Sequence, residues 1–256
     1  MVFSSKKISG IICTLSLISS SLMAAETTNE GNFSGEGELG YNSTAGNSNS
    51  SSLNAKLGLT YVLADWEHNL NLNAVSAQNE GVSTRERYLL DGQASRTFSE
   101  VYYGFGNLRY DKDLFSGYDY QTNITAGIGR RFWQPKTEVL NLELGAGYQV
   151  DKLQNQPEHA NPILRSALKL RYPMNKQVSL SQDLLVNAGD RNVHSESISG
   201  IKVNMTESLA LKLSYTLKHN SKVLDGRDKL DTLTAVTLVY GRSEEHTSEL
   251  QSRQSI

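Results

Sequence analysis

The feature that most constrains this chain is a strict alternation of apolar and polar residues, sustained over about 10 residues at a time. In the segment 140–150 each even position is apolar, and each odd position is polar or glycine. The segment 53–63 shows the same pattern, with Val62 as an exception. A period of two places successive side chains on opposite faces, so each segment predicts a β-strand with one apolar and one polar face.

About 12 such segments follow one another along the chain. They span 33–44, 52–63, 66–77, 85–95, 101–110, 119–130, 138–150, 163–172, 177–187, 194–204, 208–219 and 231–241. The segments 85–95, 101–110 and 194–204 are weaker, and their pattern does not say which face points inward. Strands of a soluble sandwich usually have about 5–6 residues, whereas strands of about 10 residues match a tilted crossing of a bilayer.

The predicted connections alternate in length. The short ones are residues 64–65, 96–100, 173–176 and 205–208, the longer ones are 45–51, 78–84, 111–118, 151–162 and 221–230, and the short 189–193 breaks the trend. An even number of strands with short turns at one end is typical of outer-membrane barrels, and closure keeps every backbone group paired in lipid. We therefore predict an all-β fold, a 12-stranded antiparallel transmembrane β-barrel, with a soluble periplasmic β protein as the alternative.

Aromatic residues gather near the short-turn ends of the predicted strands. They are Tyr61, Trp66, Phe132, Trp133, Tyr172 and Tyr240. Amphipathic rings at one level of a barrel are typical of an interfacial girdle, so the apolar face is expected to contact lipid.

Three stretches carry a resemblance to a known family. They are AGNSNSSSLNAKLGLTY (45–61), DLFSGYDYQTNITAGIGRRF (113–132), and LALKLSYTLKHNS with DTLTAVTLVY (209–221 and 231–240). Together they resemble the YdiY-like family of Gram-negative salt-induced outer membrane proteins, a domain of unknown function. The resemblance spans residues 33–241 and implies a single outer-membrane barrel of unproven activity, with no catalytic residues. The family tends to have prolines where this chain has Lys222-Val223-Leu224.

Both ends of the chain predict segments outside the barrel. Residues 1–25 combine Lys6 and Lys7, a short apolar run and Ala24-Ala25, which is the pattern of a cleaved secretory signal peptide. The single cysteine, Cys13, lies inside this segment, so the exported chain has no disulfide and no thiolate metal ligand. The barrel is assigned to residues 26–241. Residues 242–256 lack strand alternation and read as a sequencing-adapter translation, so we expect a non-native tail that stands exposed and unpaired while the last strand closes on the first.

The polar face of the predicted strands lines the barrel interior. The early strands contribute acids and amides, namely Glu36, Glu38, Asn69, Asn71 and Asn73, and the late strands contribute bases, namely Arg165, Lys169, Arg171, Lys212 and Lys218. Such a division would set a transverse field across a small aqueous pore. The alternative is an interior closed by ion pairs, and a 12-stranded barrel lies between filled and open barrels.

His219 and Ser221 form the one candidate for catalysis. They stand two residues apart on the outward face of a strand and resemble in outline the His-x-Ser pair of outer-membrane phospholipase A and the lipid A deacylases. A serine nucleophile needs a base, and the base needs an orienting acid or amide. Asp228 and Glu196 are the available candidates for that third group, and Lys222 stands where those enzymes have asparagine. A polar strand end in contact with lipopolysaccharide is the alternative.

Other charged groups predict no site. Asp111, Asp113, Gly117 and Asp119 miss the spacing of a calcium loop and are interpreted as an acidic, solvated loop. Arg130 and Arg131 suit a lipid headgroup interface, and the net charge of -2 indicates no nucleic-acid partner. His68, His159 and His194 are scattered without metal spacing.

The sequence thus predicts an exported protein of the cell outer membrane, structural or a narrow passive pore, with an outer-leaflet lipid hydrolase using His219 and Ser221 as the alternative. No enzyme activity, cofactor, metal or catalytic residue is assigned. The expected partners are outer-membrane lipids, lipopolysaccharide and the barrel-assembly machinery.

Overall fold

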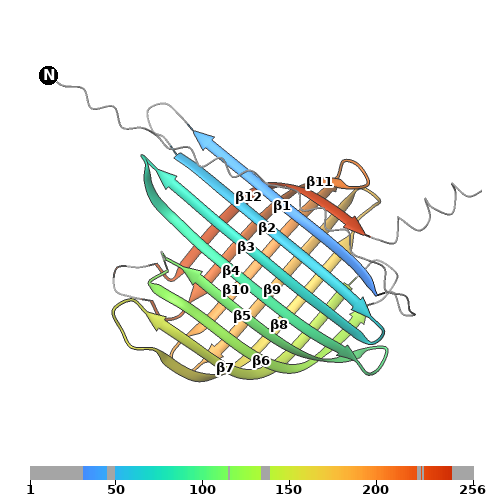
Figure 1. Cartoon of the computed structure of the whole chain (residues 1–256), viewed down its shortest axis with the longest axis horizontal. Coiled ribbons are helices and arrows are strands. Elements are labelled where there is room, and N and C mark those ends of the chain that lie inside the picture. The colour runs from blue at the N-terminus through green and yellow to red at the C-terminus, as the bar shows by residue number, and fades with distance from the viewer. Residues whose placement is uncertain are drawn as a thin grey trace, which may run out of the picture. The chain divides into compact units, whose positions relative to one another are not determined.

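The chain folds into a closed antiparallel barrel of twelve strands (Figure 1). The computed structural model describes residues 31–44, 50–114, 116–133, 139–223, 226 and 228–243. The strands are β1 (Asn32–Thr44), β2 (Ser50–Leu63), β3 (Trp66–Asn79), β4 (Val82–Thr97), β5 (Tyr102–Asp113), β6 (Tyr118–Trp133), β7 (Val139–Leu153), β8 (His159–Pro173), β9 (Val178–Gly189), β10 (Val193–Asn204), β11 (Leu209–Asn220) and β12 (Leu230–Ser243). The predicted fold class is confirmed. The predicted signal peptide and residues 244–256 of the predicted tail lie outside the described residues.

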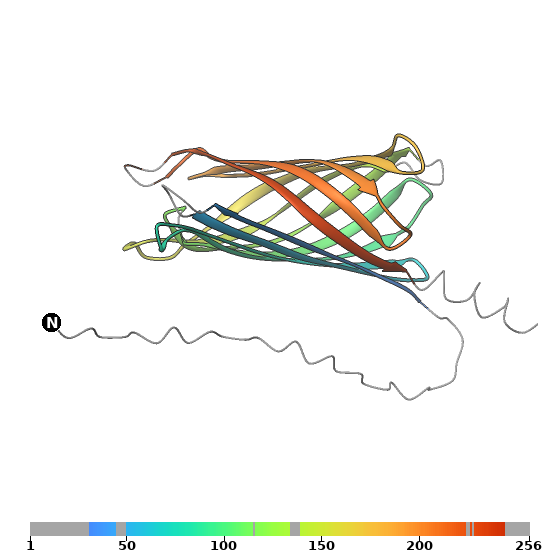
Figure 2. The same cartoon turned by 90° about the horizontal axis from the view of Figure 1, so that it is seen from above.

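Each strand pairs with its neighbours in the sequence, and β12 pairs with β1 to close the ring. The strands are inclined to the long axis of the barrel (Figure 2). We call the end where β1 begins and β12 finishes the terminal end, and the other the far end. No helix long and apolar enough to cross a membrane occurs in the described part of the chain.

The predicted difference in loop length between the two ends is wrong. At the far end the strands take up half or more of three of the five longer predicted loops, 78–84, 111–118 and 151–162, and only residues 80–81 remain outside strands in the first of them. Glu80 and Gly81 both have a positive φ, as a two-residue hairpin turn requires. The longest connection at this end spans residues 221–229. Sequence alternation missed the extra strand residues because both faces are polar there, which removes the period-two signal without removing backbone pairing.

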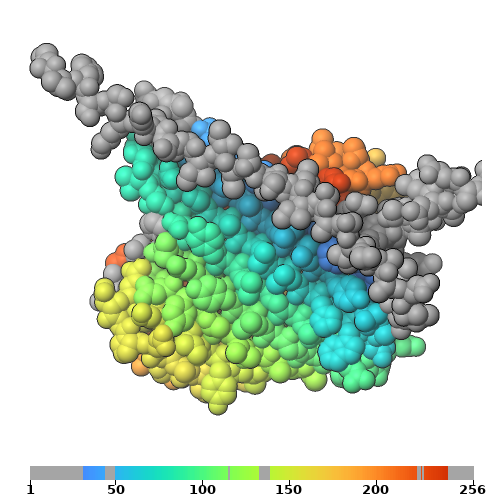
Figure 3. Space-filling model, viewed as in Figure 1, coloured from blue at the N-terminus to red at the C-terminus, as the bar shows by residue number. Residues whose placement is uncertain are grey.

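The alternation predicts the two faces of the wall correctly. Leu53, Leu142 and Leu213 are about two-fifths exposed or more on the outside, whereas Asn54, Glu143 and Ser214 beside them are buried inside. Figure 3 shows one side of the barrel, where the side chains of β2 to β7 form a continuous outer surface. The buried residues therefore lie inside the barrel and are mostly polar, and the large exposed residues on the outside are mostly apolar.

An aromatic girdle surrounds the terminal end. Its exposed members are Tyr61, Trp66, Phe132, Tyr172 and Tyr240, as predicted, together with Phe33, Phe98 and Tyr102. The side chain of Trp133, also predicted, lies outside the described residues. A second set of exposed tyrosines lies nearer the far end and comprises Tyr41, Tyr88, Tyr110, Tyr148 and Tyr215.

The two girdles are separated by about the thickness of a membrane core. On β5, Tyr102 and Tyr110 are eight residues apart. Eight residues cover roughly 27 Å of strand, or about 20 Å of bilayer at a tilt of about 40°, close to the apolar band of about 25 Å in outer-membrane barrels. Leu108 lies between them and is exposed.

The closing seam between β1 and β12 is the shortest pairing in the described barrel. It joins six residue pairs, from Ser34 with Ser243 to Leu39 with Leu238. Arg242 and Ser243, assigned to the tail, therefore continue β12 and pair with β1. Beyond the paired stretch, Arg85 of β4 donates a hydrogen bond to the carbonyl oxygen of Thr232 on β12 at 3.4 Å.

Candidate functional site: the barrel lumen

A network of buried ion pairs occupies the far half of the lumen. Arg87 on β4 donates two hydrogen bonds to the carboxylate of Asp111 on β5, at 3.0 and 2.7 Å. Its Nη2 also donates to Oε2 of Glu196 on β10 at 2.9 Å, and Nη2 of Arg109 donates to the same oxygen at 2.8 Å. Lys218 on β11 donates to Asp111 at 3.4 Å and to Asp113 at 3.1 Å. We call these six residues the cross-lumen network.

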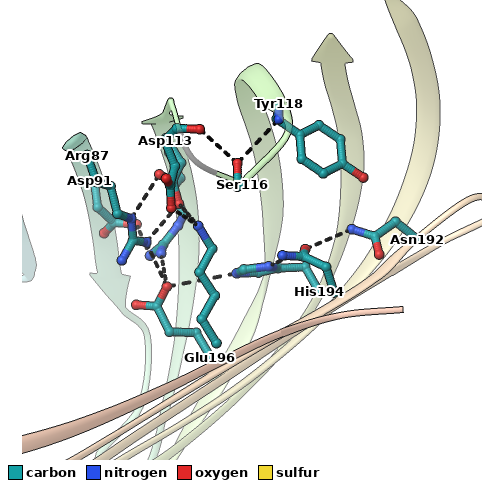
Figure 4. A network of polar contacts seen from close by, with 12 residues as sticks. Arg87, Asp91, Asp113, Ser116, Tyr118, Asn192, His194 and Glu196 are labelled. Atoms are coloured by element: carbon teal, nitrogen blue, oxygen red, sulfur yellow. Dashed lines mark hydrogen bonds and ion pairs between the residues drawn. The ribbon is translucent and has the colours of Figure 1, made fainter. Parts of the chain in front are cut away.

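The network joins opposite walls of the barrel. β4 and β10 stand six positions apart in either direction around the ring, and so do β5 and β11. Figure 4 shows the side chains of Arg87 and Asp113 pointing from one wall toward Glu196 on the other. His194 extends the network on β10, since its Nε2 lies 3.8 Å from Oε2 of Glu196. Its Nδ1 lies 3.0 Å from Oδ1 of Asn220, which also accepts a hydrogen bond from Asn192. The lumen is therefore bridged at this level.

Buried ions of this kind depend on complete pairing. Arg87, Glu196 and Lys218 expose 6%, 5% and 1% of their surface. Removing charges from water costs several kcal/mol per ion, which only well-formed hydrogen bonds and opposite charges offset. Each of these groups has at least two charged partners or hydrogen bonds to charged groups. The cross-lumen network is thus a fully paired set of buried charges.

The lumen beside β5 to β8 is filled by side chains. Tyr103, Phe105 and Ile163 point inward and are buried. Glu143 accepts hydrogen bonds from Gln93 at 2.8 Å, from the hydroxyl of Tyr103 at 2.9 Å and from Arg165 at 2.7 Å. The guanidinium of Arg165 lies 4.8 Å from the ring centre of Phe105. This side of the barrel resembles a packed core.

The inner wall of β1, β2 and β3 is different, because its inward residues form five regular rows. From the far end to the terminal end, the rows are Asn42–Ser52–Ala77, Gly40–Asn54–Val75, Glu38–Lys56–Asn73, Glu36–Gly58–Asn71 and Ser34–Thr60–Asn69. Most of these side chains are small or carry an amide or hydroxyl. We call this surface the β1–β3 wall.

A cavity at each end of the barrel is lined in part by the β1–β3 wall. The far cavity has a volume of about 540 Å³ and is lined by Asn42, Ser50, Ser51, Ser52, Ala77, Gln78, Asn79 and Thr84, with no charged residue. The terminal cavity has a volume of about 730 Å³, and its charged lining residues are Glu36, Lys202 and Glu207. The far cavity includes the first row and the terminal cavity the fourth, so two rows separate them.

The first of these two separating rows is Gly40–Asn54–Val75. Asn54 is buried, and neither its amide nitrogen nor its amide oxygen has a hydrogen-bond partner among the described residues. In the next row, the amide oxygen of Asn73 is also buried without a partner in that part of the chain. Buried polar groups nearly always find a partner, which is ordered water when the protein supplies none. Asn54 and Asn73 therefore place amide groups without a described protein partner in the two rows between the cavities.

The second separating row carries charge. Nζ of Lys212 on β11 contacts Oε1 of Glu38 at 2.5 Å, and Nζ of Lys56 lies 3.8 Å from Oε2 of the same carboxylate. The hydroxyl of Thr237 donates to Oε2 of Glu38 at 3.3 Å. Two lysines thus share one carboxylate. The next ion pair toward the terminal end, Lys202 with Glu36 at 2.7 Å, is one to one.

The predicted transverse field is wrong. The residues named for the interior do face inward, and Lys218, Lys212 and Arg165 all form ion pairs there. However, early strands also contribute the bases Arg87 and Arg109, and late strands the acid Glu196. Opposite charges therefore meet at the centre instead of facing each other across water. The sequence prediction failed because Arg87, Arg109 and Glu196 all lie in the segments whose inward face was ambiguous.

Two other predicted groups are corrected by the structure. Asp111 and Asp113 do not form a solvated loop, because both lie on β5, are 5% exposed and pair with Lys218. Arg130 and Arg131 do not share an interface, because adjacent strand residues face opposite sides. Arg130 lies outside over Phe132 at 4.7 Å, and Arg131 lies inside over Tyr103 at 4.7 Å. No group of three potential metal ligands occurs in the described ranges.

His219 and Ser221 lie where a strand end was predicted, but they are not brought together as a dyad. The hydroxyl of Ser221 donates to Oδ1 of Asn192 at 3.2 Å and accepts the backbone N–H of Val193 at 2.8 Å. Glu196 is excluded as the orienting acid, since it lies inside the barrel in the cross-lumen network. Ser221 therefore fastens the end of β11 to the start of β10.

Comparison with known proteins places the chain in a family. The profile described as "Protein of unknown function, DUF481" matches residues 37–241. "Uncharacterized protein YdiY" of Escherichia coli (strain K12) is 26% identical over 210 residues, which cover 81% of this chain and 82% of that protein.

Two solved structures are also similar. The NanC porin has a TM-score of 0.49 and 10% identity, covering 80% of this chain and 97% of its own. The COG4313 outer membrane channel from Pseudomonas putida F1 has a TM-score of 0.47 and 13% identity, covering 85% of this chain and 97% of its own. With the family profile matching residues 37–241, the chain belongs to the YdiY-like family, DUF481.

Proposed function

We propose that this protein is an outer-membrane barrel with a narrow passive pore along its β1–β3 wall. The single observation that carries the proposal is the pair of polar cavities that enter this wall from opposite ends and are separated by two rows of residues. Asn54 and Asn73, which lie in those rows, offer amide groups without protein partners. Water and small polar solutes can bind such groups during passage.

The cross-lumen network and the filled side of the lumen explain why the proposed pore is narrow. Ion pairs from β4 and β5 to β10 and β11 occupy the centre, and Tyr103, Phe105 and Ile163 fill the opposite side. The proposed conducting path is then a narrow channel along the β1–β3 wall, in contrast to the wide water-filled channel of larger barrels.

The proposed location follows from the outer surface. A closed barrel with an apolar band between two aromatic girdles satisfies the needs of a bilayer, since all backbone groups in lipid must be paired. We propose export by a signal peptide at residues 1–25, insertion by the barrel-assembly machinery, and contact with phospholipid and lipopolysaccharide. The girdle arginines Arg96 and Arg130, which lie over Trp66 and Tyr102, support headgroup contact at the terminal end.

The test is single-channel conductance of the refolded protein in a planar bilayer. Wild type should give small, stable steps. Val75→Gly should enlarge them, because Val75 is buried in a separating row. Val203→Ala, on the lipid side of β10 and 40% exposed, is the matched control and should leave them unchanged. Folded barrels that pass no current, in wild type and in Val75→Gly alike, would exclude the pore.

A further inference from the structure

The ion pairs of Glu38 determine the net charge that a solute would meet along the β1–β3 wall. Lys56, in the third row, and Lys212, on β11, both approach this carboxylate. Two positive charges and one negative charge therefore meet at the level of the third row. The two lysine side chains are 22% and 17% exposed, whereas that of Glu38 is 8% exposed. The charge that remains open to the path is therefore positive.

Lys56 has the greater capacity to bind a solute. Its ammonium has three N–H donors, and its ion pair with Glu38 is 3.8 Å long, beyond the range of a hydrogen bond. Glu38 is already occupied by Lys212 and by the hydroxyl of Thr237. The donors of Lys56 are thus available to an anion in one of the two rows that separate the cavities.

The charged residues that line the two cavities do not offset this excess. The far cavity has no charged lining residue. In the terminal cavity Lys202 and Glu36 pair one to one, which leaves Glu207 in the exposed turn 205–208. A charge at a solvated rim is screened by water and salt, whereas one at a constriction with little water acts at a lower effective dielectric. The third row therefore dominates the selectivity.

We propose that the pore prefers small monovalent anions and that Lys56 and Lys212 are its selectivity-determining residues. This inference rests on the proposed pore function. The neutral amides and hydroxyls of the other rows form hydrogen bonds with the solute and its water shell. The lysine pair replaces part of that shell at the third row. The narrowness of the path restricts the class to ions of about the size of chloride or a short carboxylate.

The experiment measures the reversal potential of single channels in a gradient of potassium chloride. The reversal potential of wild type should have the sign of the chloride equilibrium potential. Lys56→Gln should shift the potential toward zero, Lys56→Gln with Lys212→Gln should move it to the potassium side, and Glu38→Gln should strengthen the preference for chloride. The four forms step the formal charge of the row from -1 to +2 (wild type +1), so the potentials should follow that order.

A matched control removes charges without changing the balance. Glu36→Gln with Lys202→Gln deletes the neighbouring one-to-one pair, and its reversal potential should equal that of wild type. Heat-modifiable gel mobility confirms that each variant is folded. Conducting channels that prefer potassium, or a series without the expected order, would overturn the anion preference and leave the pore in place. A folded wild type without conductance would overturn the pore itself.

Discussion

Arg87 and Glu196 meet across the lumen, with Nη2 of the arginine 2.9 Å from Oε2 of the glutamate, although their strands β4 and β10 stand on opposite sides of the ring. A direct contact of this kind requires the two walls to approach within the combined length of two side chains. The contact therefore defines the inner dimension of the barrel at this level.

The first prediction concerns the stability of this bridge. Glu196→Ala leaves Arg87 and Arg109 without a shared carboxylate and should reduce the free energy of unfolding by about 3–5 kcal/mol, the usual cost of breaking a buried pair. Urea titration in lipid vesicles measures the change. Asp183→Ala removes the partner of Arg171 in a half-exposed pair and should cost about 0–1 kcal/mol. Equal losses in the two variants would show that the cross-lumen network stabilises the fold no more than an exposed ion pair does.

A second prediction tests which face meets lipid. Leu57→Arg and Leu142→Arg place a charge among acyl chains and should each cost about 2–4 kcal/mol near the midplane. Asn71→Arg should cost much less, because Asn71 lines the terminal cavity. The same titration measures all three. If arginine is tolerated equally well at Leu57 and Asn71, the assignment of the two faces is incorrect.

The third prediction uses a glycine that another strand approaches closely. A Cβ placed on Gly147 of β7 would clash with the backbone oxygen of Ile124 on β6, whereas a Cβ on Gly106 would meet nothing within 4 Å. Gly147→Ala should therefore cost about 1–3 kcal/mol, the range seen when an extra carbon is forced into a packed site. Gly106→Ala should be close to neutral in the same measurement. The reverse order would mean that β6 and β7 do not approach each other closely at Gly147.

The fourth prediction separates fastening from catalysis at Ser221. Ser221→Ala removes a donor to Asn192 and an acceptor for Val193, so stability should fall by about 1 kcal/mol. Hydrolysis of phospholipid or lipid A should stay at background in both forms. Clear turnover by wild type that disappears in the variant would establish the serine as a nucleophile.

Much of the fold could be predicted because strand alternation is a local signal. The residues of 140–150 reveal which side of β7 meets lipid without reference to any other strand, and the same holds for β2 and β11. The extent of the strands could not be predicted at the far end, where Ser50 to Ser52 and Gln78 to Asn79 are polar on both faces.

The candidate site could be predicted only in its parts. The sequence indicates that Lys218 and Asn73 face inward, but not that Lys218 reaches Asp111, because that contact depends on which strand closes the opposite wall. The five rows of the β1–β3 wall depend in the same way on register between strands, which the alternation of a single strand leaves undetermined. Nothing in the sequence marked Arg87 as the residue that joins the two walls.

The cross-lumen network also has a mechanical role. Ion pairs that run from β4 and β5 to β10 and β11 act as a strut, holding those walls at a set spacing. The strut does not include β1 to β3, and β1 is tied to β10 and β11 by the ion pairs Lys202–Glu36 and Lys212–Glu38. The wall that carries the proposed path is therefore held by ion pairs separate from the strut.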